Sequence, residues 1–167
     1  TDMAVQQVGA VLVPIYPTIS GEEYGYILND CSARFIVVDS FDILRRINPV
    51  FARLEKVEKI YVLNPLSDIQ QAKLKEFDLG NIHVEPFDVL VALGRANPDR
   101  ALLDQRRDNV KTRDVATMIY TSGTTGQPKG AIFTHRCFSS WIETHKPRLT
   151  FSCAADTSIG FLPFRHV

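Results

Sequence analysis

Continuous apolar runs alternate with segments of helical periodicity in the first part of the chain. The runs at residues 9–17, 34–39 and 59–64 predict buried strands, because they are rich in β-branched residues and bounded by turn formers. One helix face is predicted between the first two strands, with apolar residues at the i, i+3, i+4 and i+7 positions: Tyr24, Ile27, Leu28 and Cys31. Strands that alternate with helices at this spacing favour βαβ units and a parallel sheet.

Helix starts can be placed from their capping residues. Ser20 with Glu23 three residues later forms the pattern of a capping box. A second helix is expected to begin at Ser40 or Asp42. Asn48, which precedes a proline, is predicted to cap a further turn.

The middle of the chain is harder to interpret. Residues 66–77 are compatible with a short helix, and residues 83–94 with a strand or turn that leads into a helix. Residues 96–114 are polar and charged, which predicts a mostly exposed connection.

The last third predicts a strand, a polar loop, a second strand and a helix. The two strands are expected at 115–120 and 131–135, and the helix at 136–146, with Trp141 in the core. A final apolar strand is predicted at 157–164. The fold class is therefore α/β, a mostly parallel β-sheet flanked by helices.

The composition of the chain disfavours several kinds of binding partner and location. Lys and Arg number 19, and so do Asp and Glu, so the formal charge of zero gives no electrostatic reason to expect nucleic acid. No apolar run approaches the roughly 20 residues of a membrane span, and the first residues lack the pattern of a signal peptide. Three widely spaced cysteines favour buried thiols in a reducing cytoplasm over disulfides or zinc. We expect a cytoplasmic protein.

The polar loop between the last two clear strands carries the chemistry. Residues 121–130 read TSGTTGQPKG, with four hydroxyls, three glycines and one lysine. Glycine-rich turns can aim successive N–H groups at one anion, and hydroxyls add short donors. Lys129 adds a positive charge on a long stem. This combination suits a polyphosphate.

Two other nucleotide loops are excluded by spacing. A Walker A loop needs glycine before its lysine and a helix after it, whereas here Pro128 precedes Lys129 and a strand is expected next. The dinucleotide pattern G-x-G-x-x-G is also absent. A phosphate-loop hydrolase is thus disfavoured, although a surface hairpin made only of turn formers remains an alternative.

The string YTSGTTGQPKG, residues 120–130, resembles the signature phosphate loop of the AMP-forming acyl and aryl adenylating enzymes. Residues 9–39 resemble the segment that precedes this loop in long-chain fatty acyl-CoA synthetases. FLPFRHV, residues 161–167, is similar to their FLPLxHV segment, with Phe164 and Arg165 as departures. The resemblance covers most of the chain and is weakest through 65–114.

The resemblance implies a set of site residues. Those that match the loop holding the β- and γ-phosphates of ATP are Thr121, Ser122, Gly123, Thr124, Thr125, Gly126 and Lys129. His166 matches a histidine beside the acyl pocket and the reacting carboxylate. Lys129 and His166 are therefore the expected catalytic residues, and no metal ligand is assigned within the chain.

The resemblance also implies the reaction and its co-substrates. A fatty acid attacks the α-phosphate of ATP with Mg²⁺, giving acyl-adenylate and pyrophosphate, and the thiol of coenzyme A then displaces AMP. Residues 1–167 are expected to be part of an N-terminal AMP-binding domain, with its start, the downstream remainder and a small C-terminal domain absent. Such a piece alone is expected to be inactive, and its self-association through exposed core stays open. Peripheral membrane association of the parent, another acyl or aryl ligase, and a non-catalytic binding role all stay open.

Overall fold

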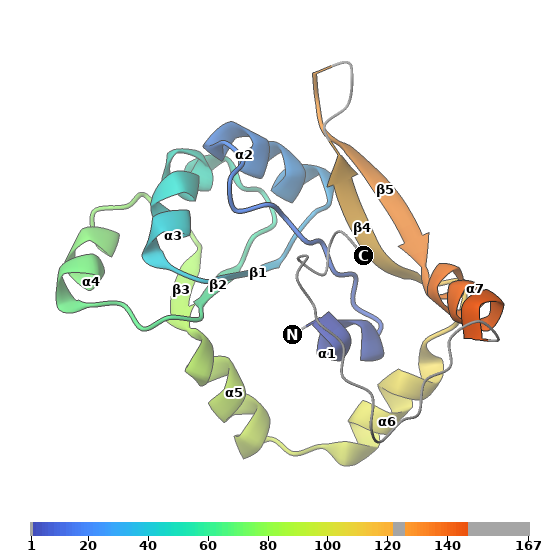
Figure 1. The fold of residues 1–167 in the computed structure, drawn as a ribbon. Helices are drawn as coiled ribbons and strands as arrows, with labels where there is room; N and C mark the ends of the chain where they lie inside the picture. The colour runs from blue at the N-terminus through green and yellow to red at the C-terminus, as the bar shows by residue number, and fades with distance from the viewer. Residues whose placement is uncertain (1, 122–125, 147–167) are drawn as a thin grey trace. The chain divides into compact units, whose positions relative to one another are not determined.

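A computed structural model describes residues 2–121 and 126–146 of the chain (Figure 1). These residues form two compact units. One comprises residues 15–100 with 126–129, and the other comprises 2–14, 101–121 and 130–146. The strand predicted at 157–164 lies outside the described residues.

The first unit is built on a parallel three-stranded sheet in the order β1–β2–β3. Its strands are β1 (Phe35–Val38), β2 (Lys59–Val62) and β3 (His83–Pro86). The register aligns Ile36 with Ile60 and Ile60 with Val84, which puts their apolar side chains in one row across the sheet. The predicted parallel α/β fold is confirmed for these strands.

Helices pack on this row through one apolar cluster. They are α2 (Gly21–Asp30), α3 (Phe41–Ile47) and the 3₁₀-helix η1 (Asn48–Arg53). The side chains of Leu44, Ile47 and Ile60 are completely buried at its centre. Amphipathic helices need such a face because burial of apolar surface, more than intrinsic propensity, stabilises them.

The capping box predicted for the first helix is present. The hydroxyl of Ser20 accepts a hydrogen bond from the N–H of Glu23 at 3.2 Å, and the Glu23 carboxylate accepts one from the N–H of Ser20 at 2.9 Å. The prediction for Asn48 is wrong, because Ile47 occupies the N-cap and Asn48 is already helical. The proline after Asn48 suits the first turn of a helix, so the chain passes from α3 into η1 without a break.

Two further helices complete this unit: α4 (Asp68–Leu74) and α5 (Phe87–Ala96). Both confirm sequence predictions. α5 contacts β2 and β3, whereas α4 has no fully buried residue. On the sheet face opposite to the apolar row, Lys59 and Glu85 form an ion pair at 2.9 Å.

The second unit contains α1 (Asp2–Gln7), most of α6 (Arg100–Asn109), the two-stranded sheet of β4 (Val115–Thr121) and β5 (Lys129–Thr134), and α7 (His135–His145). Figure 1 draws the arrows of β4 and β5 in opposite directions, as expected for a hairpin. The strand–loop–strand–helix order predicted from the sequence is therefore confirmed. The segment 96–114 is exposed as predicted, but it contains the helix α6 and is more than a connection.

The buried strand predicted at residues 9–17 is wrong. Only Leu12 forms a bridge, parallel to Thr117 of β4. The N–H of Leu12 donates to the carbonyl of Ala116 at 3.1 Å, and the N–H of Met118 donates to the carbonyl of Leu12 at 3.0 Å. The next donor in a parallel ladder is residue 14, a proline without an N–H, so the pairing stops there.

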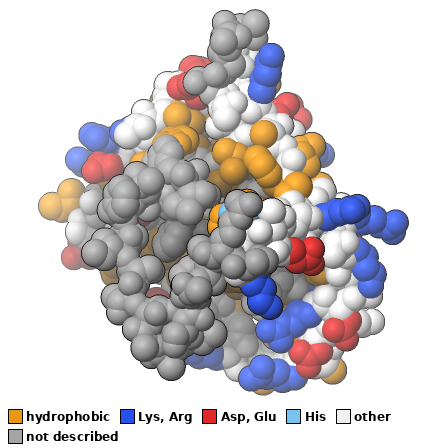
Figure 2. Space-filling model, turned by 45° about the vertical axis from the view of Figure 1, so that its right-hand side comes forward, with side chains coloured by type: hydrophobic (Ala, Val, Ile, Leu, Met, Phe, Trp, Pro, Cys, Tyr) orange, Lys and Arg blue, Asp and Glu red, His pale blue; other side chains and the backbone are white. Residues whose placement is uncertain are grey.

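Exposed apolar residues lie on β5 and α7. Trp141, predicted to be a core residue, is 56% exposed, and its ring stacks on His145 with 4.4 Å between ring centroids. The others are Ile132, Phe138 and Ile142. Figure 2 shows hydrophobic side chains at the molecular surface on the side it presents. None of the described helices is long and apolar enough to span a bilayer.

Candidate functional site

The glycine-rich loop lies between β4 and β5 in the sequence. β4 is a partly buried strand in which Ala116, Thr117 and Tyr120 are the most buried residues. Thr117 is the polar member, and its hydroxyl donates to the carbonyl of Leu12 at 2.8 Å. Because a buried hydroxyl needs a partner, this bond and the backbone bridge hold the strand that leads into the loop.

Three of the predicted phosphate-loop residues are described. Thr121 is exposed at the end of β4, Lys129 is exposed as the first residue of β5, and Gly126 is exposed between them. The other predicted site residues lie outside the described part of the chain: Ser122, Gly123, Thr124, Thr125 and His166. The geometry of the phosphate site thus stays a prediction.

Gly126 has a backbone conformation that requires glycine. Its φ is +103°, a region that residues with a side chain rarely adopt, although no atom would obstruct a Cβ there. Pro128, two residues later, is buried. The loop therefore returns to β5 through a turn that favours glycine, followed by a buried proline.

Tyr120 and Gly130 form a close contact at the base of the hairpin that the sequence analysis missed. A Cβ on Gly130 would lie 3.0 Å from Cζ of Tyr120 and 3.2 Å from its hydroxyl oxygen. Tyr120 is 8% exposed, so its ring occupies the space that a side chain at 130 would need. The sequence could have indicated this contact, because it places a bulky aromatic residue and a glycine on the two strands of a predicted hairpin.

His135 follows the end of β5 that is farthest from the loop. Its N–H donates to the carbonyl of Asp114 at 3.0 Å, and the N–H of Arg136 donates to the carbonyl of Thr112 at 2.7 Å. These bonds satisfy two of the free N–H groups at the start of α7. The Nε2 atom of His135 is buried and has no hydrogen-bond partner in the described structure.

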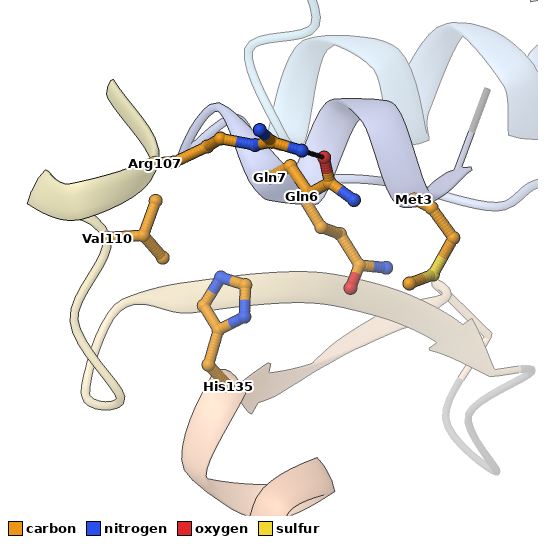
Figure 3. Close-up of a pocket in the computed structure, with 6 residues that line it drawn as sticks. All are labelled: Met3, Gln6, Gln7, Arg107, Val110 and His135. Atoms are coloured by element: carbon orange, nitrogen blue, oxygen red, sulfur yellow. Dashed lines mark hydrogen bonds between the residues drawn. The ribbon is translucent and has the colours of Figure 1, made fainter. Parts of the chain in front are cut away.

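An open cavity of about 400 Å³ lies beside this histidine (Figure 3). Figure 3 shows side chains from α1, α6 and the start of α7 around it, with a hydrogen bond of 2.9 Å from Nη2 of Arg107 to Oε1 of Gln7. The lining residues are Met3, Gln6, Gln7, Arg107, Val110 and His135. Of the predicted phosphate-loop residues that the structure describes, Thr121, Gly126 and Lys129, none lines the cavity.

The cysteines differ from the expectation of buried thiols. Cys31 is half-buried, and burial raises the pKa of its thiol. Cys137 in the first turn of α7 is exposed, and its Sγ lies 3.4 Å from the hydroxyl oxygen of Thr134. That hydrogen bond lowers the pKa of the Cys137 thiol. Cys31 is the C-cap residue of α2, whereas Cys137 lies on a helix without buried residues; Cys153 lies outside the described residues.

Comparison with known proteins shows relatives along the whole chain. The model of the family described as "AMP-binding enzyme" matches residues 1–167. Long chain acyl-CoA synthetase 6, peroxisomal, of Arabidopsis thaliana is 27% identical over 99% of this chain and 22% of its own length. Long-chain-fatty-acid–CoA ligase ACSBG2 of Xenopus laevis is 34% identical over 95% of this chain and 20% of its own length.

The fold has a relative among solved structures. The crystal structure of the anthranilate CoA ligase AuaEII in complex with anthranoyl-AMP matches with a TM-score of 0.55 and 24% identity, over 81% of this chain and 22% of the other. The chain thus spans about a fifth of the length of these relatives. Because the family model covers every residue, the chain belongs to the AMP-binding enzyme family.

Proposed function

We propose that the protein containing this chain activates a fatty acid with ATP, first to acyl-adenylate and then to acyl-CoA, releasing pyrophosphate and AMP. The observation that carries the proposal is the loop TSGTTGQPKG between β4 and β5 in a chain that the AMP-binding family matches throughout. The names of two relatives, a long chain acyl-CoA synthetase and a long-chain-fatty-acid–CoA ligase, support the substrate class.

In the proposed reaction, the loop holds the leaving pyrophosphate. Negative charge grows on the bridging oxygen as its bond to the α-phosphorus breaks. Donors that are already oriented toward that oxygen lower the barrier, because they interact more strongly with the transition state than with bound ATP. The hydroxyls and N–H groups of the loop supply neutral donors, and Lys129 supplies the cation.

The described residues are consistent with this role for the loop. Lys129 is exposed at the start of β5, so its ammonium group is accessible to a ligand. Thr121 is exposed at the end of β4, and the positive φ of Gly126 allows a sharp turn between them. His166 is proposed to lie beside the reacting carboxylate, and coenzyme A is the proposed thiol co-substrate.

Magnesium belongs to the proposed reaction because the substrate is a triphosphate. Mg²⁺ at such sites is usually held by phosphate oxygens, water and one or two carboxylates. The described residues contain no group of three His, Cys, Asp or Glu side chains suited to a metal. The proposal accordingly assigns no step to the metal through the described residues.

The acid that is activated is the least constrained part of the proposal. Two matched proteins are named for other acids: an anthranilate CoA ligase and a 3-methylmercaptopropionyl-CoA ligase of Ruegeria pomeroyi, the latter 29% identical over 98% of this chain. Aryl and short-chain acyl substrates are accordingly the alternatives to test. A cytoplasmic location and peripheral association with a membrane remain predictions, as does self-association of the isolated chain.

The test is acid-dependent exchange of labelled pyrophosphate into ATP by the full-length protein. We expect exchange with a long-chain fatty acid, and AMP rather than ADP as the product when coenzyme A is added. Exchange with anthranilate or a short acid, but not with a long-chain fatty acid, would show that the substrate is not a fatty acid. No exchange with any acid, or ADP as the product, would contradict adenylation itself.

The same assay tests the loop. Lys129→Ala is expected to lower the exchange rate at saturating ATP by roughly 100- to 1000-fold, the usual loss for one oriented donor to a developing charge. Lys73→Ala, at an exposed lysine of α4, is the matched control and should keep the parental rate. An unchanged rate for Lys129→Ala would remove Lys129 from the mechanism.

A further inference from the structure

We propose that the cavity beside His135 binds a small organic carboxylate, at a site lined by none of the described residues of the phosphate loop. Its volume of about 400 Å³ falls within the range of roughly 300–1,000 Å³ typical of small-molecule sites. The inference goes beyond the proposed adenylation reaction, because it concerns residues on α1, α6 and the start of α7 that the reaction does not use.

The charge of the lining favours an anion. Among the described residues that line the cavity, Arg107 is the only formally charged one, and none is a carboxylate. The nearest acidic contact of Arg107 is Asp104, at 3.5 Å from Nη1, in an ion pair whose side chains are 45% and 63% exposed. Solvent screens such a pair strongly, so Asp104 leaves the guanidinium available to an anion.

Arg107 also keeps free donor capacity. A guanidinium group has five N–H donors in a planar fork. The described contacts use one for Oε1 of Gln7 at 2.9 Å and one for Asp104. A planar carboxylate is the natural partner of the donors that remain, because its two oxygens match two parallel N–H groups.

His135 provides the second recognition element. Its Nε2 is buried without a partner, and buried polar atoms without partners are uncommon in proteins. Figure 3 shows the imidazole ring extending from the start of α7 toward the side chains of α1 and α6. Nε2 is buried as the ring stands, so the ring would turn toward the cavity to donate from Nε2 to the second oxygen of a carboxylate held by Arg107.

The remaining lining residues define the size and character of the ligand. The amide of Gln6 adds a polar group, whereas Met3 and Val110 add apolar surface. A carboxylate with a short aliphatic part would satisfy both kinds of surface, whereas inorganic phosphate would use only the polar one. The expected ligand class is thus a short-chain organic acid.

The experiment follows the ring signals of His135 in the full-length protein labelled at histidine Cε1, assigned by their loss in His135→Gln. The probes are butyrate, its neutral isostere butyramide, and inorganic phosphate. We expect butyrate to shift the His135 signal with saturation and butyramide to leave it unchanged. This local readout separates the cavity from any acyl-binding site elsewhere in the protein, so its result is independent of the proposed adenylation.

Two arginines of α6 provide matched variants. Arg107→Met should weaken butyrate binding at His135 about tenfold or more, the effect of losing one charge-assisted pair. Arg107→Lys, which keeps the charge, should weaken it less and covers the case in which Arg107→Met does not fold. Arg106→Met removes an arginine that does not line the cavity and should bind as the parent does.

Three outcomes would overturn the proposal. These are equal shifts with butyrate and butyramide, no saturable shift with butyrate, and equal binding by the Arg106→Met and Arg107→Met variants. If phosphate gave a larger saturable shift than butyrate, the site would bind phosphate and not an organic carboxylate, which would also contradict the proposal.

Discussion

The phenol ring of Tyr120 lies against Gly130, so that a methyl group on Gly130 would be 3.0 Å from Cζ of the ring. The two residues come from β4 and β5, immediately outside the loop proposed to hold pyrophosphate. Contacts at this distance require something to move, and Tyr120 is nearly buried. A side chain at position 130 would therefore require the Tyr120 ring to shift by a few tenths of an ångström.

Replacement of Gly130 by alanine should destabilise the hairpin. Overpacking of a buried contact costs about 1–3 kcal/mol, so we expect Gly130→Ala to lower the free energy of unfolding by that amount. Thermal or urea denaturation of the full-length protein measures it. In a Tyr120→Leu background, which removes the ring, the cost of Gly130→Ala should shrink by about 1 kcal/mol; equal costs in both backgrounds would refute the contact.

Alanine substitutions at two glycines with positive φ can distinguish an effect on stability from an effect on function. Gly126 has φ +103° and Gly80 has φ +54°, and neither would place a Cβ within 4 Å of another atom. Alanine at either position should cost about 1–3 kcal/mol through backbone strain alone. Only Gly126→Ala should also slow pyrophosphate exchange at saturating ATP, because only Gly126 belongs to the proposed loop. Similar exchange rates for the two variants would count against a role for Gly126.

Two capping boxes allow a paired test of local and global stability. Ser20 caps α2, which buries Tyr24, Ile27 and Leu28, whereas Ser67 caps α4, which has no fully buried residue. Ser20→Ala should lower the global free energy of unfolding by about 1 kcal/mol, the usual loss of an N-cap. Ser67→Ala should instead increase hydrogen exchange in α4 with a smaller global change. A larger loss of global stability for Ser67→Ala than for Ser20→Ala would show that α4 is part of the cooperative core.

The ion pair of Glu22 with Arg53 predicts a pH dependence. Their side chains are 2.6 Å apart, and the hydrogen bond from Arg53 lowers the pKa of Glu22 below its ordinary value of 4.5. A carboxylate whose pKa is depressed on folding stabilises the native state above its unfolded pKa, and loses this contribution as the pH falls through the folded pKa. The stability contributed by Glu22 should therefore decline below pH 4.5.

The comparison that isolates this effect uses glutamine variants. Glu22→Gln should show a shallower loss of stability below pH 4.5 than the parent protein, and added salt should reduce the difference because the pair is exposed. The exposed Glu76 supplies the control variant, Glu76→Gln. Parallel pH profiles for the parent and Glu22→Gln would show that the ion pair does not contribute.

Local sequence patterns predicted most of the described elements. The capping box at Ser20, the apolar face around Tyr24 and the β-branched runs of β1 and β2 each depend on residues a few positions apart. The loop TSGTTGQPKG is likewise a contiguous motif, and it was sufficient to indicate the family that the comparisons show. Short-range interactions suffice for these features.

Other features depend on which segments meet in three dimensions. Residues 9–17 have the composition of a buried strand, yet they pair only at Leu12, because the partner β4 would next require an N–H from a proline. Trp141 has the periodicity of a core residue, but periodicity cannot say whether another element covers that face. The amphipathic pattern therefore predicted the helix α7 correctly but was wrong in predicting that its apolar face is buried.

The sequence by itself determined the parallel α/β class, the capping box that starts α2 and the glycine-rich loop, because each is encoded within a few turns or strands of contiguous chain. Only the tertiary structure decided that the Tyr120 ring lies against Gly130 and that Arg107 and His135 line one cavity. These contacts join residues 10 to 28 positions apart in the chain, through register and packing that no local pattern specifies.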